Sequence, residues 1–261
     1  MILLRRRDRL GNWLFQYCFA RVLAQRFGYR LEVLPVAGFP GSFAELAGEE
    51  VYGPEVRWHG QWPYEAYSGR RLVREEFFQR PGQRLMLDGW FQRFELIAAA
   101  REEIRRDWLR VDGTLPVRPS GDLAICLRLG ADYAQAGSLA DSILREEEIR
   151  RLARCVPHER LYFVTDAPGH PLLAKLGDLG AEVFAGGGLA DFRFIQSFQK
   201  IAFCQSTFQW WAAFLSEARE IYFPPCDRGL WSHPEPADLA WQPSHWGIDL
   251  RVDEESYIYD W

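Results

Sequence analysis

Residues 201–215, IAFCQSTFQWWAAFL, join a short apolar run to two hydroxyl residues and a second apolar segment. The run at residues 201–204 has the length and composition of a strand buried inside a parallel sheet. Ser206 and Thr207 follow it, in the place where Ser and Thr commonly cap the N-terminus of a helix. The segment therefore predicts a buried strand that leads directly into a helix, the repeating unit of an α/β fold.

The same alternation continues through the second half of the chain. Apolar runs that favour strands occupy residues 123–127, 161–164, 182–184, 202–204 and 221–223, and the segments between them favour helices at 144–154, 171–179, 191–200 and 207–218. Strands and helices that alternate at this spacing are typical of a parallel sheet covered by helices on both faces. We therefore predict that this half is Rossmann-like.

The N-terminal half opens with a similar unit. An apolar run at residues 1–4 is followed by an expected glycine turn at Gly11 and Asn12, and then by a helix over residues 13–28. Apolar side chains recur there every four residues, at Phe15, Phe19, Leu23 and Phe27. This is the period of one helical face, and Gly28 suits the C-terminal cap.

The rest of the N-terminal half gives a weaker pattern. We expect strands at residues 31–34 and 84–87, a loop-rich stretch at 35–60 and a helix at 94–109. Residues 112–121, DGTLPVRPSG, have the composition of a linker. The chain is therefore predicted to form an N-terminal α/β domain at 1–115 and a C-terminal Rossmann-like domain at 116–261.

Composition and charge narrow the class of protein. Hydrophobic residues make up 48% and charged residues 26% of the 261 residues, which is a normal globular balance. The formal net charge of −5 argues against nucleic acid as a partner. Five cysteines without a C-x-x-C spacing favour neither a disulfide framework nor a zinc site.

The apolar segments also bear on location. Residues 1–4 are too short for the apolar core of a signal peptide, and no run of about 18 apolar residues occurs. We therefore expect a soluble, cytoplasmic protein with no integral membrane segment. The oligomeric state is left open.

A single arginine follows the strand predicted at residues 123–127. In the segment 122–133, DLAICLRLGADY, Arg128 lies at the carboxyl end of that strand, where ligands bind in open α/β sheets. A guanidinium there can bind two phosphate oxygens at once. The alternative is a structural salt bridge from Arg128 to Asp132 or to another carboxylate.

The hydroxyl residues at 206 and 207 offer a second anion site. The N-terminus of a helix presents backbone N–H groups that bind phosphate. Ser206 and Thr207 would therefore contact a phosphate, unless Ser206 only caps the helix and the tryptophans behind it pack in the core. Trp210 and Trp211 lie inside the apolar helix and are predicted to be structural.

Several segments resemble one known family, the α-1,2-fucosyltransferases. Residues 10–17, LGNWLFQY, resemble the family's G-L-G-N-Q-M-F-Q-Y opening, and residues 205–215 resemble N-S-T-F-S-W-W-A-A-x-L. Residues 126–133 resemble H-x-R-R-G-D-Y, and are closer still to the H-x-R-x-G-x-D form of protein O-fucosyltransferases. Residues 87–92, LDGWFQ, and 163–166, FVTD, match further elements in the expected order, and Asp191 opens the family's next helix.

The chain departs from the family's pattern at five positions. Cys126 replaces a histidine, Leu129 the second arginine, Trp13 a glutamine and Gln205 an asparagine, and Ala167 stands where a second acidic residue is expected. Three of these changes remove polar or charged groups near the expected donor. They leave the identity of the sugar nucleotide open.

The resemblance implies two Rossmann-like domains facing a cleft, the GT-B-like arrangement, with the acceptor on the N-terminal side. It implies an inverting transfer of fucose from GDP-fucose to a galactosyl hydroxyl of a glycan, with α-1,2 linkage. No D-x-D triplet occurs, so we expect no metal and no other cofactor.

Candidate site residues follow from these patterns and from the resemblance. Arg128 and Asp132 are the catalytic candidates; Asp132 either acts as a base or orients Arg128. Asp166 either contacts the base or ribose of the nucleotide or caps the next helix. The donor-binding candidates are Gly11, Asn12, Arg128, Asp166, Ser206, Thr207 and Phe208, and the acceptor-binding candidates are the aromatic residues Trp62 and Trp90.

The sequence leaves three other functions open. A catalytically degenerate relative that binds carbohydrate is suggested by Cys126 and Leu129. A transferase that uses a different sugar nucleotide would keep the same fold. A dinucleotide-dependent oxidoreductase ranks last, because the first turn lacks G-x-G-x-x-G.

Overall fold

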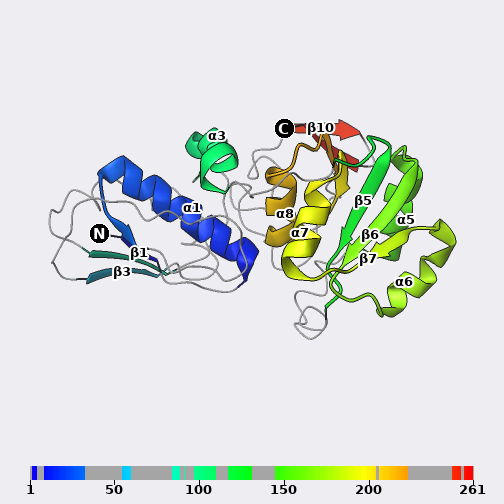
Figure 1. Cartoon of the computed structure of the whole chain (residues 1–261), viewed down its shortest axis with the longest axis horizontal. Helices are drawn as coiled ribbons and strands as arrows, with labels where there is room; N and C mark the ends of the chain where they lie inside the picture. The colour runs from blue at the N-terminus through cyan, green and yellow to red at the C-terminus, as the bar shows by residue number, and fades with distance from the viewer. Residues whose placement is uncertain are drawn as a thin grey trace. The chain divides into compact units, whose positions relative to one another are not determined.

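A computed structural model of the chain describes residues 2–4, 9–32, 55–59, 84–88, 91, 97–109, 117–130, 145–203, 206–222, 249–253 and 256–260. Residues up to 112 belong to one compact unit, the first unit, and most residues after 112 belong to the second unit (Figure 1). The predicted boundary between residues 115 and 116 lies outside the described residues.

The first unit contains a parallel sheet with the strand order β2-β1-β4-β3. Its strands are β1 (Ile2–Leu4), β2 (Leu31–Glu32), β3 (Glu55–His59) and β4 (Arg84–Asp88). The stretch at 35–60 was predicted to be loop-rich, and β3 shows that this prediction was wrong for its last residues. Only two of the five residues EVRWH are apolar, so pairing with β4 rather than local sequence decides the strand.

Helix α1 (Leu10–Phe27) joins β1 to β2. It begins at Leu10, so Gly11 and Asn12 lie in its first turn, and the predicted glycine turn at these residues was wrong. The N-cap is Arg9, whose side chain makes no capping hydrogen bond, and the sequence therefore carries no marker of the start. The end was predicted correctly: Gly28 is left-handed at φ 68°, and its N–H donates to the Ala24 carbonyl.

Further helical turns follow in the first unit, within the range 94–109 where a helix was predicted. They are η3 (Ala98–Ala100), α3 (Arg101–Glu103) and η4 (Ile104–Trp108), of which η4 is a π-helical turn. Trp108 is buried, and the Arg21 guanidinium of α1 lies 4.4 Å from the centre of its ring. This cation–π contact ties the turns to α1.

The second unit contains a sheet with the strand order β10-β11-β9-β8-β5-β6-β7. The first five strands along the chain are parallel: β5 (Asp122–Leu127), β6 (Arg160–Thr165), β7 (Glu182–Phe184), β8 (Lys200–Ala202) and β9 (Glu220–Tyr222). A hairpin of β10 (Asp249–Asp253) and β11 (Ser256–Asp260) adds to β9 in antiparallel orientation. The parallel α/β fold is therefore as predicted, and the hairpin extends it.

The helices of the second unit alternate with its parallel strands. They are α5 (Glu146–Cys155), α6 (Pro171–Lys175) with the 3-10 turn η6 (Gly177–Leu179), α7 (Gly188–Gln196) and α8 (Thr207–Phe214). One predicted helix, at 191–200, is placed too far along the chain. Lys200 is the first residue of β8, because it pairs with Leu123 of β5 and with Glu220 of β9.

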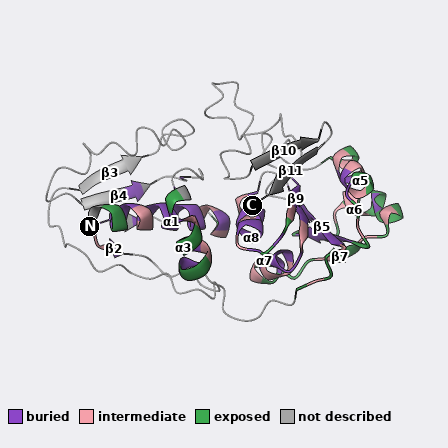
Figure 2. Cartoon of the chain, turned by 90° about the horizontal axis from the view of Figure 1, so that it is seen from above, coloured by how far each residue is buried: buried purple, intermediate pink, exposed green. Residues whose placement is uncertain are grey.

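Helices cover both faces of the parallel sheet, as predicted (Figure 1). On one face, Ile125 of β5 belongs to an apolar cluster with Ile149 and Leu152 of α5. On the other, the ring of Tyr162 in β6 lies 5.9 Å from that of Phe194 in α7. Figure 2 shows that the buried residues gather on β5, α8 and, in the first unit, α1.

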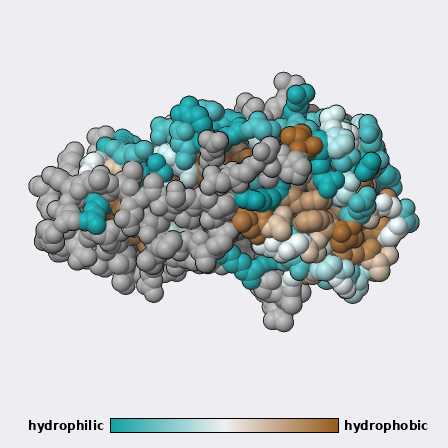
Figure 3. Space-filling view, in the orientation of Figure 1, coloured by the Kyte–Doolittle hydropathy of each residue, from teal (hydrophilic) through white to brown (hydrophobic). Residues whose placement is uncertain are grey.

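Most large apolar side chains of the described residues are at least partly buried. The exposed ones are Val117 and Val183, and Val183 lies in β7, an edge strand of the sheet. Figure 3 shows apolar surface gathered over α7 and β7, beside a largely hydrophilic surface elsewhere on the second unit. The charged surface of α5 is typical of a solvated helix, with Glu146, Glu147 and Glu148 in its first turn.

Candidate functional site

The order of the parallel strands creates a topological switch point. From β5 the chain steps to β6 and β7 on one side, and then returns to place β8 and β9 on the other side of β5. The carboxyl ends of β5 and β8 are therefore neighbours at the point where the strand order reverses (Figure 1). In open α/β sheets ligands bind in the crevice outside this point.

Arg128 is the first residue after β5 and lies at this edge of the sheet. It stands between Leu127 and Leu129, which are both buried in the apolar cluster of the second unit. Its guanidinium forms an ion pair with Asp166. The salt bridge that was the alternative to phosphate binding by Arg128 is therefore present, with Asp166 as the carboxylate. Asp132, the partner named in the prediction, lies outside the described residues.

Asp166 is the residue after β6, and the register explains why it meets Arg128. Leu127 pairs with Thr165, so the next residue on each strand comes side by side at the carboxyl edge. The Asp166 Oδ1 also accepts hydrogen bonds from the backbone N–H groups of Leu129, at 2.8 Å, and Gly130, at 3.0 Å. The carboxylate therefore contacts three groups of the segment that carries Arg128.

The alternative role of Asp166, capping the next helix, is wrong. The N-cap of α6 is His170, whose Nδ1 accepts a hydrogen bond from the Leu172 N–H at 3.2 Å. Pro171 at the first helical position favours the same start. Asp166 is thus separated from the helix by the residues of the β6–α6 loop, and its carboxylate is directed to the neighbouring strand's loop instead.

Ser206 caps α8, as predicted. It has extended backbone geometry, is 5% exposed, and its Oγ accepts a hydrogen bond from the Gln209 N–H at 3.4 Å. Thr207 and Phe208 are the first two helical residues and are half-buried. Because Ile125 of β5 pairs with Ala202 of β8, Ser206 and Arg128 both lie beyond the carboxyl ends of adjacent strands.

The two tryptophans of α8 are structural, as predicted. Trp210 is 1% exposed and Trp211 is fully buried. Phe214 stacks on Trp210 at a ring distance of 4.8 Å, and Phe208 contacts Phe192 of α7 edge-on at 5.3 Å. These contacts fix the axis of α8 and hence the place of its N-terminus.

One polar residue of the first turn of α8 was missed by the sequence reasoning. Gln209 is 5% exposed, and its Oε1 has no hydrogen-bond partner among the described residues. The available signal was the spacing of Ser206 and Gln209, which matches a capping box in which the Gln side chain accepts from the N-cap N–H. Gln209 is therefore a buried polar residue in the first turn of α8, beside the N-cap Ser206.

Three of the departures from the family's pattern, Trp13, Cys126 and Leu129, are buried. Leu129 packs into the apolar cluster, and Cys126 is 1% exposed. Burial and the nearby Asp191 carboxylate raise the pKa of the Cys126 thiol, which is therefore neutral near pH 7. At neither Cys126 nor Leu129 does a charged side chain reach the carboxyl edge of the sheet.

Asp191 closes the glycine turn at residues 186–188. Its Oδ1 accepts hydrogen bonds from the N–H groups of Gly186, at 2.8 Å, and Gly187, at 3.1 Å. Gly187 and Gly188 have φ values of 78° and 47°, which favour glycine. Burial raises the pKa of Asp191, and the two hydrogen bonds oppose that rise.

The structure describes only some of the remaining predicted site residues. Gly11 and Asn12 lie in the first turn of α1, in the first unit, and their role in donor binding stays a prediction. Asp132, Trp62 and Trp90 lie outside the described residues.

Within the described part of the chain, no helix combines the length and the apolar character that crossing a membrane requires. The same residues contain no group of three or more His, Cys, Asp or Glu side chains that could hold a metal ion. Metal-independent catalysis and a cytoplasmic location stay predictions.

The described cysteines should differ sharply in reactivity. Cys18 and Cys126 are buried, whereas Cys155, at the end of α5, is exposed. Iodoacetamide should therefore modify Cys155 in the native protein and reach the other two only after unfolding, as peptide mapping by mass spectrometry would record. Native modification of Cys126 at the rate of Cys155 would contradict its burial.

The chain is similar to solved structures of fucosyltransferases. NodZ α-1,6-fucosyltransferase soaked with GDP-fucose aligns over 87% of this chain and 96% of its own, with 16% identity and a TM-score of 0.48. A NodZ structure from Bradyrhizobium aligns over 85% and 95%, with 17% identity and a TM-score of 0.44. A mutant of Arabidopsis thaliana FUT1 in complex with GDP aligns over 94% and 72%, with 10% identity and a TM-score of 0.48. No protein-family model and no curated protein sequence matches the chain.

Proposed function

We propose that the chain is an inverting, metal-independent glycosyltransferase that moves fucose from GDP-fucose to a galactosyl hydroxyl of a glycan in α-1,2 linkage. The observation that carries the proposal is the switch point between β5 and β8, with Arg128 on one side and the N-terminus of α8 on the other. A cationic fork and a helix N-terminus at a switch point suit a nucleoside diphosphate. The motifs that resemble those of fucosyltransferases support guanosine as the nucleoside and fucose as the sugar of the donor.

The charges at this edge suit the chemistry of a leaving diphosphate. As the bond between sugar and phosphate breaks, negative charge grows on the diphosphate oxygens. The Arg128 guanidinium has five N–H donors in a fixed plane, and the first turn of α8 adds backbone N–H groups and the positive end of the helix dipole. Donors held in place by the fold stabilise such charge without reorganising. We therefore assign Arg128, Ser206, Thr207 and Phe208 to the donor.

The acceptor side of the reaction is assigned from the sequence. The attacking hydroxyl must lose a proton, and Asp132 is the candidate base, with orientation of Arg128 as its other possible role. Trp62 and Trp90 are candidates for stacking on the acceptor sugar. Gly11 and Asn12 are donor-binding candidates because residues 10–17 resemble the family's opening motif.

Slow hydrolysis of the donor tests the proposal without knowledge of the acceptor. The protein is incubated with a panel of sugar nucleotides in EDTA, and release of the nucleoside diphosphate is measured. GDP-fucose should be hydrolysed fastest, and added Mg²⁺ or Mn²⁺ should not raise the rate. A hydrolysis rate that depends on the metal would contradict metal independence. Faster hydrolysis of another sugar nucleotide would show that this compound, rather than GDP-fucose, is the donor.

A second function is favoured by the buried departures at Cys126 and Leu129. With a neutral thiol and an apolar side chain at these positions, the site has fewer charged groups than the family's motif provides. The chain would then bind carbohydrate without catalysis. Glycan binding on an array, with no hydrolysis of any sugar nucleotide, would support this alternative, and any turnover would exclude it.

A further inference from the structure

We propose that Asp166 is a positioning residue that holds the Arg128 segment in its diphosphate-binding geometry, rather than a direct contact of the nucleotide. The inference rests on the proposed function for the identity of the ligand. It differs from the sequence-based role, in which Asp166 contacts the base or ribose. The inference is based on the contacts that the Asp166 carboxylate makes.

The two carboxylate oxygens serve different parts of one segment. Oδ1 accepts from two consecutive backbone N–H groups, those of Leu129 and Gly130, and Oδ2 pairs with the Arg128 guanidinium. Bonds to two successive amides fix the backbone that follows Arg128, and the ion pair directs its side chain. Charge-assisted hydrogen bonds of this kind are about twice as strong as neutral ones.

The backbone on both sides of Arg128 is also held by packing. Leu127 and Leu129 are each 2% exposed and belong to the apolar cluster of the second unit. Arg128 itself keeps 21% of its side chain exposed. The arginine is thus anchored through its neighbours and oriented by a carboxylate, so the guanidinium needs little ordering when an anion binds. A guanidinium can bind a carboxylate and a phosphate at once, because it has five donors.

A double-mutant cycle separates positioning from direct contact. In the wild-type background, Asp166→Ala should raise the dissociation constant for GDP about 10- to 100-fold, as expected for the loss of hydrogen bonds to a charged group. In an Arg128→Ala background the same change should alter it by less than about twofold, because the guanidinium that Asp166 positions is gone even though the Leu129 and Gly130 N–H contacts remain. An equal loss in both backgrounds would overturn the inference and assign Asp166 to the nucleotide.

Asparagine provides a rescue variant. Asp166→Asn keeps an oxygen that accepts from the Leu129 and Gly130 N–H groups but loses the charge that pairs with Arg128. Its GDP affinity should fall between those of wild type and Asp166→Ala. A GDP affinity no better than that of Asp166→Ala would show that the contacts with the Leu129 and Gly130 backbone N–H groups do not contribute to GDP binding.

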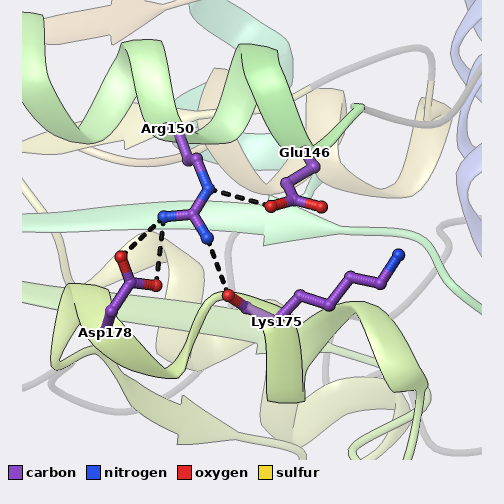
Figure 4. A network of polar contacts seen from close by, with 4 residues as sticks. All are labelled: Glu146, Arg150, Lys175 and Asp178. Atoms are coloured by element: carbon purple, nitrogen blue, oxygen red, sulfur yellow. Dashed lines mark hydrogen bonds and ion pairs between the residues drawn. The ribbon is translucent and has the colours of Figure 1, made fainter.

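A matched control comes from the ion pair of Arg150 in α5 with Asp178 in η6 (Figure 4). The Arg150 Nη1 lies 3.0 Å and 2.8 Å from the two Asp178 carboxylate oxygens, and Nη2 donates to the Lys175 carbonyl at 2.7 Å. Asp178→Asn removes a comparable charge from the surface of the same unit. It should leave GDP affinity unchanged.

Hydrogen exchange tests the positioning without any ligand. The amides of Leu129 and Gly130 should exchange at least about tenfold faster in Asp166→Ala than in wild type, and at the wild-type rate in Asp178→Asn. Unchanged exchange in Asp166→Ala would overturn the inference, whatever the protein binds. If wild type shows no affinity for GDP, the proposed function fails, while the exchange rates still decide whether Asp166 holds this segment.

Discussion

Arg128→Ala should lower kcat for donor turnover by at least about 100-fold, because one preorganised donor to a developing negative charge is worth about 3 kcal/mol. Arg128 lies at the carboxyl end of β5, at the switch point, where the leaving diphosphate would carry that charge. Arg128→Lys should lose less, since it keeps the charge but not the planar pair of donors. The rates are measured as release of GDP from GDP-fucose.

The control for this experiment is Arg150→Ala. Arg150 pairs with Glu146 and Asp178 on the helices of the same unit, at 3.0 Å and 2.8 Å, and has no part in the proposed site. Turnover by this variant should stay within about twofold of wild type, as for other surface substitutions. If Arg128→Ala also retained wild-type turnover, the assignment of the donor site would be wrong.

The second large effect concerns stability. Trp211→Ala should lower the free energy of unfolding by about 3–5 kcal/mol, the usual cost of removing a buried aromatic side chain. Trp211 is fully buried in α8, and its ring makes edge contacts with Trp210 at 4.9 Å and Phe214 at 5.4 Å. Since domains are stable by only about 5–15 kcal/mol, this loss is a large part of the total.

Urea unfolding followed by circular dichroism measures the loss. Trp211→Phe should recover part of the stability, because a smaller ring fills part of the cavity. Val183→Ala, at a side chain that is 48% exposed, serves as the control and should change stability by no more than about 0.5 kcal/mol. A loss below about 1 kcal/mol for Trp211→Ala would contradict its place in the core.

The parts of the fold that could be predicted are those with a local signal. The parallel strands β5 and β6 coincide closely with apolar runs of strand length, because central strands of a covered sheet are buried on both faces. Strand β7 also lies where it was predicted, although it is a largely exposed edge strand. Ser206 and Gly28 were placed correctly as helix caps, since their roles depend on hydrogen bonds and backbone angles within one turn. These features need no knowledge of distant residues.

The parts that were missed depend on pairing between distant segments. Strand β3 has a mixed sequence and exists through its pairing with β4, and α1 begins after Arg9 without a capping side chain. The meeting of Arg128 and Asp166 follows from the register of β5 and β6, which no motif encodes. A sequence can suggest that both residues lie at a carboxyl edge, but not which carboxylate binds the guanidinium.

The central claim is that a diphosphate binds between Arg128 and the N-terminus of α8. A crystal structure of the protein with GDP tests it most directly. We expect the diphosphate oxygens to lie within hydrogen-bond distance of the Arg128 guanidinium and of backbone N–H groups in the first turn of α8. GDP bound with its diphosphate away from both groups would contradict it.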